Sequence, residues 1–177
     1  MKKAVFLDRD GVINRVKIEG GKPLSPRRFG DFQFLPGIGQ FVKDLKVAGF
    51  LRIVVTNQPD LVRGRLEESE LNKMHDLVLG RLGVEAIYAC LHDDGDNCDC
   101  RKPKPGMLTR AAEEWKIDLP GSFMVGDTWR DMEAGKSAGC TTILIAAPYN
   151  REARGDYRVD GLPRALEIIL AAGSGKE

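Results

Sequence analysis

The sequence has no apolar run approaching the roughly 20 residues that a membrane-spanning helix requires. It also lacks an excess of one charge, since 27 Lys and Arg residues face 26 Asp and Glu residues, for a formal net charge of +1. Strong nucleic-acid binders usually carry a clear basic excess, so this balance argues against that class. An apolar, strand-like run begins already at Ala4, which is unlike a signal peptide. We therefore expect a cytoplasmic protein that binds neither membranes nor nucleic acid.

Cysteine is scarce, with four residues in 177, and three of the four are clustered. The segment C-x-H-x5-C-x-C brings together Cys90, His92, Cys98 and Cys100, whereas Cys140 stands apart. Without an export signal, clustered Cys and His indicate metal ligands before disulfides. Three thiolates and one imidazole form a closed tetrahedral set, which predicts a structural Zn²⁺ rather than a catalytic one. A redox or disulfide cluster is the alternative interpretation.

The expected role of this zinc is to fold residues 90–100, a segment too short and polar for a hydrophobic core of its own. The segment leads directly into Arg101 and Lys102, so a bound zinc would fix two positive side chains. Its acidic residues are expected to point into solvent; they are Asp93, Asp94, Asp96 and Asp99.

Apolar runs of strand length alternate with segments of helical spacing along the whole chain. The strand-like runs cover residues 4–7, 51–55, 86–91, 122–125 and 141–146. Apolar residues spaced by three and four predict helices within 38–45, 71–82, 107–115 and 166–170. This alternation predicts an α/β fold, a Rossmann-like parallel sheet flanked by helices, and a single domain over residues 1–177.

Two segments depart from the alternation. Residues 15–35 are rich in glycine and proline, and Gly20-Gly21 is a predicted hairpin tip, so we interpret this stretch as a flap over a site. Residues 172–177 are polar and are expected to be a frayed tail. The polar side of the 71–82 helix carries His75, which is expected to face solvent.

Polar side chains follow the apolar runs at the points where strands should end. Asp8 and Asp10 follow the first strand, Thr56 follows the second, and Asp127 follows a later one. In open α/β sheets these carboxyl ends meet at one edge, where ligands bind. Three carboxylates there would repel one another unless a hard cation such as Mg²⁺ were bound. One aspartate could also attack phosphorus and a second could protonate the leaving oxygen, with Lys102 or Lys104 neutralising the phosphoryl charge.

Four segments in this order, FLDRDG, VVTNQ, CRKPKPG and VGDTWRDM, resemble the motifs of the haloacid dehalogenase-like phosphohydrolases. The resemblance implies a haloacid dehalogenase-like fold without a large cap domain. It also implies a phosphatase that acts through an aspartyl-phosphate intermediate. It implies that Asp8 is the nucleophile, Asp10 the general acid and base, and Thr56 a phosphoryl contact. Lys102 matches the phosphate-stabilising lysine better than Lys104 does. Mg²⁺ would be held by Asp8, Asp127 and the main-chain carbonyl of Asp10.

The cysteine segment followed by RKPKPGM resembles one subgroup of this family, which contains the D-glycero-D-manno-heptose 1,7-bisphosphate 7-phosphatases and the histidinol-phosphate phosphatases. FLDRDGVIN and the TNQ run are more similar to the heptose enzymes, which implies a role in nucleotide-heptose and lipopolysaccharide synthesis. By contrast, the five-residue spacing between His92 and Cys98 is similar to that of the histidinol-phosphate enzymes. The resemblance further implies that Asn57, Gln58 and Arg101 recognise a small phosphorylated metabolite. We expect a monomer.

Two interpretations from other classes stay open at this point. A phospho-accepting signalling domain also uses strand-end aspartates and a lysine, although Asp10 favours turnover over a lasting phosphate. The other is a zinc-dependent nucleic-acid module or a DNA-end phosphatase, because the TNQ run also occurs in DNA 3′-phosphatases, but the near-zero net charge argues against tight DNA binding.

Overall fold

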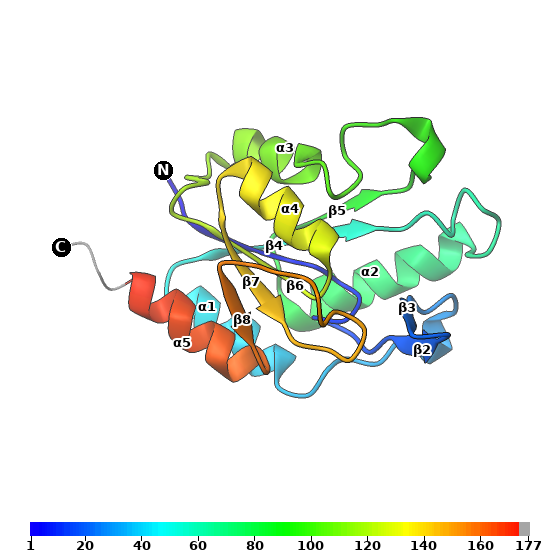
Figure 1. The fold of residues 1–177 in the computed structure, drawn as a ribbon, viewed down its shortest axis with the longest axis horizontal. Helices are drawn as coiled ribbons and strands as arrows, with labels where there is room; N and C mark the ends of the chain where they lie inside the picture. The colour runs from blue at the N-terminus through cyan, green and yellow to red at the C-terminus, as the bar shows by residue number, and fades with distance from the viewer. Residues whose placement is uncertain (174–177) are drawn as a thin grey trace.

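The computed structural model describes residues 1–173 of the chain. Its centre is a six-stranded parallel sheet of order β5-β4-β1-β6-β7-β8 (Figure 1). The strands are β1 (Ala4–Leu7), β4 (Leu51–Asn57), β5 (Ala86–Cys90), β6 (Phe123–Gly126), β7 (Thr141–Ile145) and β8 (Tyr157–Val159). The chain moves outward from β1 to β4 and β5, then returns to β6 on the other side of β1. This reversal next to β1 is where open α/β sheets form their ligand crevice.

Helices cover both faces of the sheet, which gives three layers (Figure 1). One face carries α1 (Ile38–Val47), α2 (Glu68–Leu82) and α5 (Leu162–Gly173). The other carries α3 (Gly106–Trp115) and α4 (Trp129–Ala138). The central strands β1 and β6 are buried along their whole length, because each has a hydrophobic cluster on both sides. The predicted α/β fold is confirmed.

The element limits agree closely with the apolar pattern. The first strand has the predicted bounds, and the other four differ from prediction by one or two residues at one or both ends. Two elements were not predicted, α4 and the edge strand β8. Helix α4 buries the polar Asp131 and the small Ala134 and Gly135, and Met132 is its one large apolar buried residue, so an apolar periodicity does not reveal it. Cys140 is buried as a small core residue.

The excursion at residues 15–35 contains the predicted hairpin, formed by β2 (Lys17–Glu19) and β3 (Lys22–Leu24). Gly20 and Gly21 have φ values of 56° and 75°. Two consecutive positive φ values are what a type I′ hairpin turn requires, and glycine adopts them without strain. Two short 3-10 turns also occur, at Phe29–Asp31 and Asp94–Asp96. Within residues 1–173, the sheet carries this hairpin and the cysteine segment but no large cap domain.

Two further expectations concern the tail and membranes. Most of the predicted frayed tail, 172–177, lies outside the described residues, although α5 continues to Gly173. No helix within residues 1–173 combines the length and apolar character needed to cross a membrane.

Candidate active site

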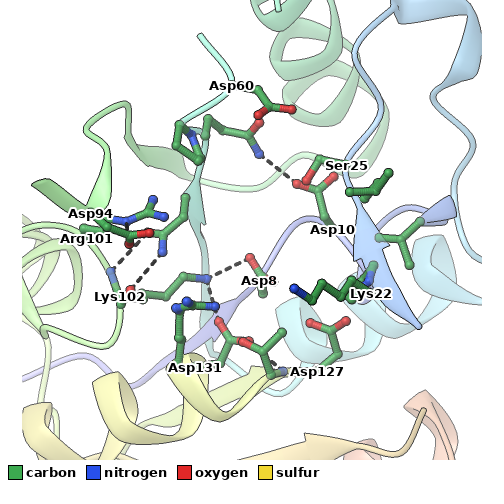
Figure 2. Close-up of a pocket in the computed structure, with 18 of the residues that line it drawn as sticks. Asp8, Asp10, Lys22, Ser25, Asp60, Asp94, Arg101, Lys102, Asp127 and Asp131 are labelled. Carbon is green, nitrogen blue, oxygen red and sulfur yellow. Dashed lines mark hydrogen bonds and ion pairs between the residues drawn. The ribbon is translucent and has the colours of Figure 1, made fainter. Parts of the chain in front are cut away.

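The carboxyl ends of the adjacent strands β4, β1 and β6 form one edge of a polar cleft (Figure 2). Asp8 and Asp10 follow β1, Asn57 ends β4, and Asp127 follows β6. These four side chains line the cleft, whereas Thr56, which the sequence also singled out, is buried behind its surface and does not line it. Hairpin residues including Lys22 and Ser25 line the opposite side, which places the 15–35 excursion beside the site.

Lys102 lies at the centre of the carboxylates. Its side chain is 3 % exposed, and its Nζ donates to Asp8 Oδ1 at 2.8 Å, to Asp131 Oδ1 at 2.6 Å and to the Val55 carbonyl at 2.8 Å. Burial acts to lower the pKa of Lys102, but Asp131 and then Asp8 raise it above its usual value overall. The amine is therefore a fixed positive charge beside the expected nucleophile. Lys104, the alternative, instead donates to the Cys98 carbonyl at 2.8 Å.

Asp131 is a member of this cluster that sequence reasoning did not assign to the site. Its Oδ1 accepts from Lys102, while its Oδ2 accepts from the Thr128 amide at 2.9 Å and hydroxyl at 2.6 Å. Thr128 and Asp131 thus form a capping box at the start of α4. The T-x-x-D spacing was the available signal, because it predicts a helix start immediately after Asp127.

The cluster is short of positive charge. Burial, then Asp131, raises the pKa of Asp8 to about 7, although Lys102 opposes the shift. Burial, then Asp8 and Asp131, raises the pKa of Asp127 well above its usual value. Oxygen atoms of these three carboxylates lie within 4.8 Å of one another. Such crowding favours protons or a cation in the cleft.

The carboxylates of the cleft are suited to binding a hard cation such as Mg²⁺. Asp127 Oδ1 is buried and has no hydrogen-bond partner, whereas Oδ2 accepts from the Tyr149 hydroxyl at 2.5 Å. One oxygen is therefore held by the protein and the other is free to coordinate a metal. Gly11, at φ 95°, packs so closely that a Cβ there would lie 2.0 Å from Asp127 Oδ2. A side chain at position 11 would displace the carboxylate, which explains the glycine that follows Asp10.

Asp10 is held by donors on both of its oxygens. Arg9 Nη2 donates to both at 3.1 Å, Asn14 Nδ2 donates to Oδ1 at 2.9 Å, and Gln58 Nε2 donates to Oδ2 at 2.7 Å. Burial acts to raise the pKa of Asp10, but Arg9 and the hydrogen bonds lower it overall. The sequence identified Asp10 but not Arg9 or Asn14, because nothing in their spacing shows that they turn toward it.

The three polar residues at the end of β4 connect the parts of the site. Thr56 is completely buried, and its hydroxyl accepts from Gln58 Nε2 at 2.8 Å. Asn57 Nδ2 donates to the Lys102 carbonyl at 3.0 Å and its Oδ1 accepts from the Lys102 amide at 3.1 Å. Asn57 thereby fixes the backbone that carries the central lysine, and Gln58 links Thr56 to Asp10. Both amide side chains also line the cleft, so substrate recognition by them stays a prediction.

Basic side chains surround the mouth of the cleft and favour an anionic ligand. Arg101 lines it, with a 12 % exposed side chain that pairs with Asp94 at 2.8 Å. Lys22 points into the cleft from the hairpin side (Figure 2). The full set of basic lining residues is Lys22, Arg27, Arg63, Arg65, Arg101, Lys102 and Arg130.

The four predicted zinc ligands form a compact group beyond the end of β5. The sulfur atoms of Cys90, Cys98 and Cys100 lie 3.1 to 3.7 Å apart, and His92 Nδ1 lies 3.3 Å from Cys100 and 3.6 Å from Cys90. Tetrahedral zinc with Zn–S bonds of about 2.3 Å would place its sulfur ligands about 3.8 Å apart, close to this spacing. The four cysteines of the chain are free, so the disulfide alternative is not what the geometry shows.

Of the four acidic residues in the cysteine segment, Asp94, Asp96 and Asp99 are exposed, as expected. Asp93 is only partly exposed, because it forms a two-point ion pair with Arg63, whose Nε lies 2.7 Å from Asp93 Oδ2. The expectation that His75 faces solvent is wrong: its side chain is half-buried and its Nε2 lies 3.1 Å from Arg9. This error arises because Arg9, from a distant segment, packs against a helical face that the local pattern marks as polar.

Comparison with known proteins identifies the family. A model described as HAD-hydrolase-like matches residues 99–162. The chain is 44 % identical over 157 residues to the D-glycero-beta-D-manno-heptose-1,7-bisphosphate 7-phosphatase of Pasteurella multocida, covering 82 % of each chain. It is 36 % identical over 160 residues to the D-glycero-alpha-D-manno-heptose-1,7-bisphosphate 7-phosphatase of Campylobacter jejuni, covering 88 % of this chain and 87 % of the relative. This chain belongs to the haloacid dehalogenase-like hydrolases.

A solved structure of the same family matches the fold described above. The D,D-heptose 1,7-bisphosphate phosphatase of B. bronchiseptica, complexed with magnesium and phosphate, aligns with a TM-score of 0.81 and 32 % identity, covering 96 % of this chain and 98 % of that one. The haloacid dehalogenase-like fold without a large cap, expected from the motifs, is therefore confirmed.

Proposed function

We propose that this chain is a Mg²⁺-dependent phosphatase that hydrolyses the 7-phosphate of D-glycero-D-manno-heptose 1,7-bisphosphate, in nucleotide-heptose biosynthesis. The observation that carries the chemistry is the joint placement of Asp8, Asp10, Lys102 and Asp127 around one cleft. The observation that favours the heptose substrate over histidinol phosphate is the set of curated relatives, which are named for the heptose bisphosphate.

Asp8 acts as the nucleophile and becomes the aspartyl-phosphate. Its Oδ1 accepts from the Arg9 amide and from Lys102, both at 2.8 Å, so the carboxylate is held in one orientation while its other oxygen attacks phosphorus. Lys102, fixed by Asp131 and by Asn57, neutralises negative charge on the phosphoryl oxygens. Thr56 donates its hydroxyl proton to a phosphoryl oxygen.

Asp10 protonates the departing sugar oxygen and afterwards removes a proton from the attacking water. The protein's donors hold its pKa low in the free enzyme. A phosphoryl group close to Asp10 acts in the opposite direction, because a nearby negative charge raises the pKa of a carboxyl group. Asp10 would thus take up its proton when the substrate is in place, at the stage where an acid is needed.

Two metals complete the proposed enzyme. Mg²⁺ held by Asp8, Asp127 and the Asp10 carbonyl would neutralise phosphoryl charge and offset the repulsion among the carboxylates. Zn²⁺ held by Cys90, His92, Cys98 and Cys100 would be structural. Burial, and then the hydrogen-bonding contacts of the Cys90 thiol with Cys100 and Cys98, raise the pKa of Cys90 to about 12, so zinc binding would have to release its proton.

Recognition of the sugar and its other phosphate falls to residues at the rim. Arg101 is suited to an oxyanion because a guanidinium binds two oxygens with parallel donors, and Asn57 and Gln58 border the same space. We propose that residues 1–177 form one phosphatase domain that works as a cytoplasmic monomer.

The test is a phosphate-release assay with Mg²⁺ on both anomers of the heptose bisphosphate, on histidinol phosphate and on a panel of other sugar phosphates. ³¹P NMR of the product identifies which phosphate remains. The proposal expects the highest kcat/KM for a heptose bisphosphate with the 1-phosphate retained. A preference for histidinol phosphate, or loss of the 1-phosphate, would overturn it.

A further inference from the structure

Arg9, the residue between the two catalytic aspartates, is buried and its guanidinium faces Asp10 from behind the cleft. It is 0 % exposed, the largest of the fully buried side chains. Its Nη2 lies 3.1 Å from each oxygen of Asp10, and its Nε lies 3.3 Å from Oδ1. The Phe32 ring lies 5.9 Å from the guanidinium carbon. The Asp10 side chain is only 10 % exposed, and the guanidinium is one of the groups that fix the orientation of its carboxylate.

His75, on α2, contacts the guanidinium nitrogen of Arg9 that does not face Asp10. Arg9 Nη1 lies 3.1 Å from His75 Nε2. A guanidinium can only donate, so Nε2 has to be the acceptor, and the proton of the neutral ring has to be on Nδ1. Burial, then the charge of Arg9, lowers the pKa of His75 to about 4, which is consistent with a neutral ring at physiological pH.

We propose that Arg9 and His75 are positioning residues for general acid catalysis: His75 accepts a hydrogen bond from Arg9 and thereby holds the guanidinium in the plane that orients the Asp10 carboxylate. Neither the Arg9 guanidinium nor the His75 ring lines the cleft, so both act through Asp10, although the main-chain amide of Arg9 also donates to Asp8. Asn14 and Gln58 hold the same carboxylate from other directions, so loss of His75 would loosen Asp10 rather than release it.

This inference rests on the proposed phosphatase activity. Substrates with different leaving groups distinguish a positioning role of His75 from a merely structural one. Departure of a sugar alkoxide needs a proton from Asp10, whereas p-nitrophenolate is stable enough to leave without one. A variant with a badly oriented Asp10 should therefore lose kcat/KM on the heptose bisphosphate while keeping it on p-nitrophenyl phosphate. A variant whose fold or metal site is damaged should lose both equally.

Three substitutions of His75 form a matched set. His75→Gln keeps an acceptor near the position of Nε2, while His75→Phe and His75→Leu remove it; Gln and Leu have similar helix propensities, so α2 itself is little affected by either. General acid catalysis contributes 10²- to 10⁴-fold, so partial misorientation should cost on the order of tenfold in kcat/KM on the sugar substrate. The loss should fall in kcat more than in KM, and His75→Gln should stay within about twofold of the wild type.

Equal losses on the two substrates, or full activity of both His75→Phe and His75→Leu, would overturn the proposal. If either apolar variant unfolds, the other and His75→Gln still give the comparison. ¹⁵N NMR of the ring nitrogens tests the geometry without turnover: at pH 7 the structure requires a non-protonated Nε2 on His75, and His75→Gln identifies its signals because the chain has only two histidines. A His75 ring that is protonated on Nε2, or on both nitrogens, would overturn the proposed hydrogen bond from Arg9 to His75. Absence of phosphate release by the wild type would instead overturn the proposed function.

Discussion

Replacing Asp8 by asparagine should stabilise the Mg²⁺-free protein and abolish its activity. Burial, then Asp131, raises the pKa of Asp8 from a usual value of 3.8 to about 7. Between these values the folded protein binds a proton that the unfolded chain has lost, so ionisation of Asp8 lowers the free energy of unfolding as pH rises. Three pKa units correspond to about 4 kcal/mol at pH 8, where Asp8 is ionised in both states. At pH 5.5 the same relation leaves a penalty of about 2 kcal/mol.

The Asp8→Asn variant escapes this penalty because its amide cannot ionise, while its oxygen can still accept from Lys102. At pH 8 its melting temperature should therefore exceed that of the wild type by roughly 10 °C, using the 2–4 °C per kcal/mol typical of a chain of this size. The advantage should be about half as large at pH 5.5. Thermal unfolding followed by circular dichroism in Mg²⁺-free buffer, with the zinc content checked at each pH, measures both values.

Saturating Mg²⁺ provides the internal control. The cation should stabilise the wild type more than Asp8→Asn, because the variant has lost a charged ligand, and the difference in melting temperature should shrink or reverse. Phosphate release by the variant should be undetectable. A variant less stable than the wild type at pH 8 without Mg²⁺, or an advantage independent of pH, would refute the idea that the carboxylates are crowded. Near-normal turnover would remove Asp8 as the nucleophile.

Two further outcomes are expected at the metal sites. Cys98→Ser should lose zinc, measured by atomic absorption, and lower the melting temperature in the same preparation; zinc loss with unchanged stability and activity would contradict the structural role. Gly11→Ala should weaken Mg²⁺ binding about tenfold or more in calorimetry, because the new Cβ displaces the Asp127 carboxylate that would hold the cation. Gly37→Ala is its control, since Gly37 has a similar φ of 82° with open space around it and should lose only about 1 kcal/mol of stability. Equal Mg²⁺ affinity in the two glycine variants would show that the close approach to Asp127 is unimportant.

The sheet and the residues at its strand ends could be predicted because their signals are local. An apolar run such as 4–7 reports burial on both faces, and a carboxylate directly after it has to lie at the sheet edge. The clustering of the cysteines was equally predictable, since Cys90 and Cys100 are close in sequence and the loop between them has little choice of path; that they hold zinc stays a prediction. The hairpin at Gly20-Gly21 was predictable from its turn chemistry alone.

The partners of those residues were decided by the tertiary structure. Lys102 could be named from its motif, but its contact with Asp131 depends on how α4 packs against the sheet. His75 was assigned to solvent because its helical face is polar, yet that face meets Arg9 from 66 residues away.

By itself, then, the sequence determined the α/β architecture, the identity of the strand-end carboxylates and the cysteine cluster. Periodicity and short-range spacing report which side chains are buried or grouped along the chain. Which donor meets which buried carboxylate was decided only when helices and strands packed, because hydrogen bonds are directional and act over about 3 Å. Asp131, Tyr149, and the contact between Arg9 and His75 belong to that second class, and they set the charge and orientation of the aspartates that the sequence had already revealed.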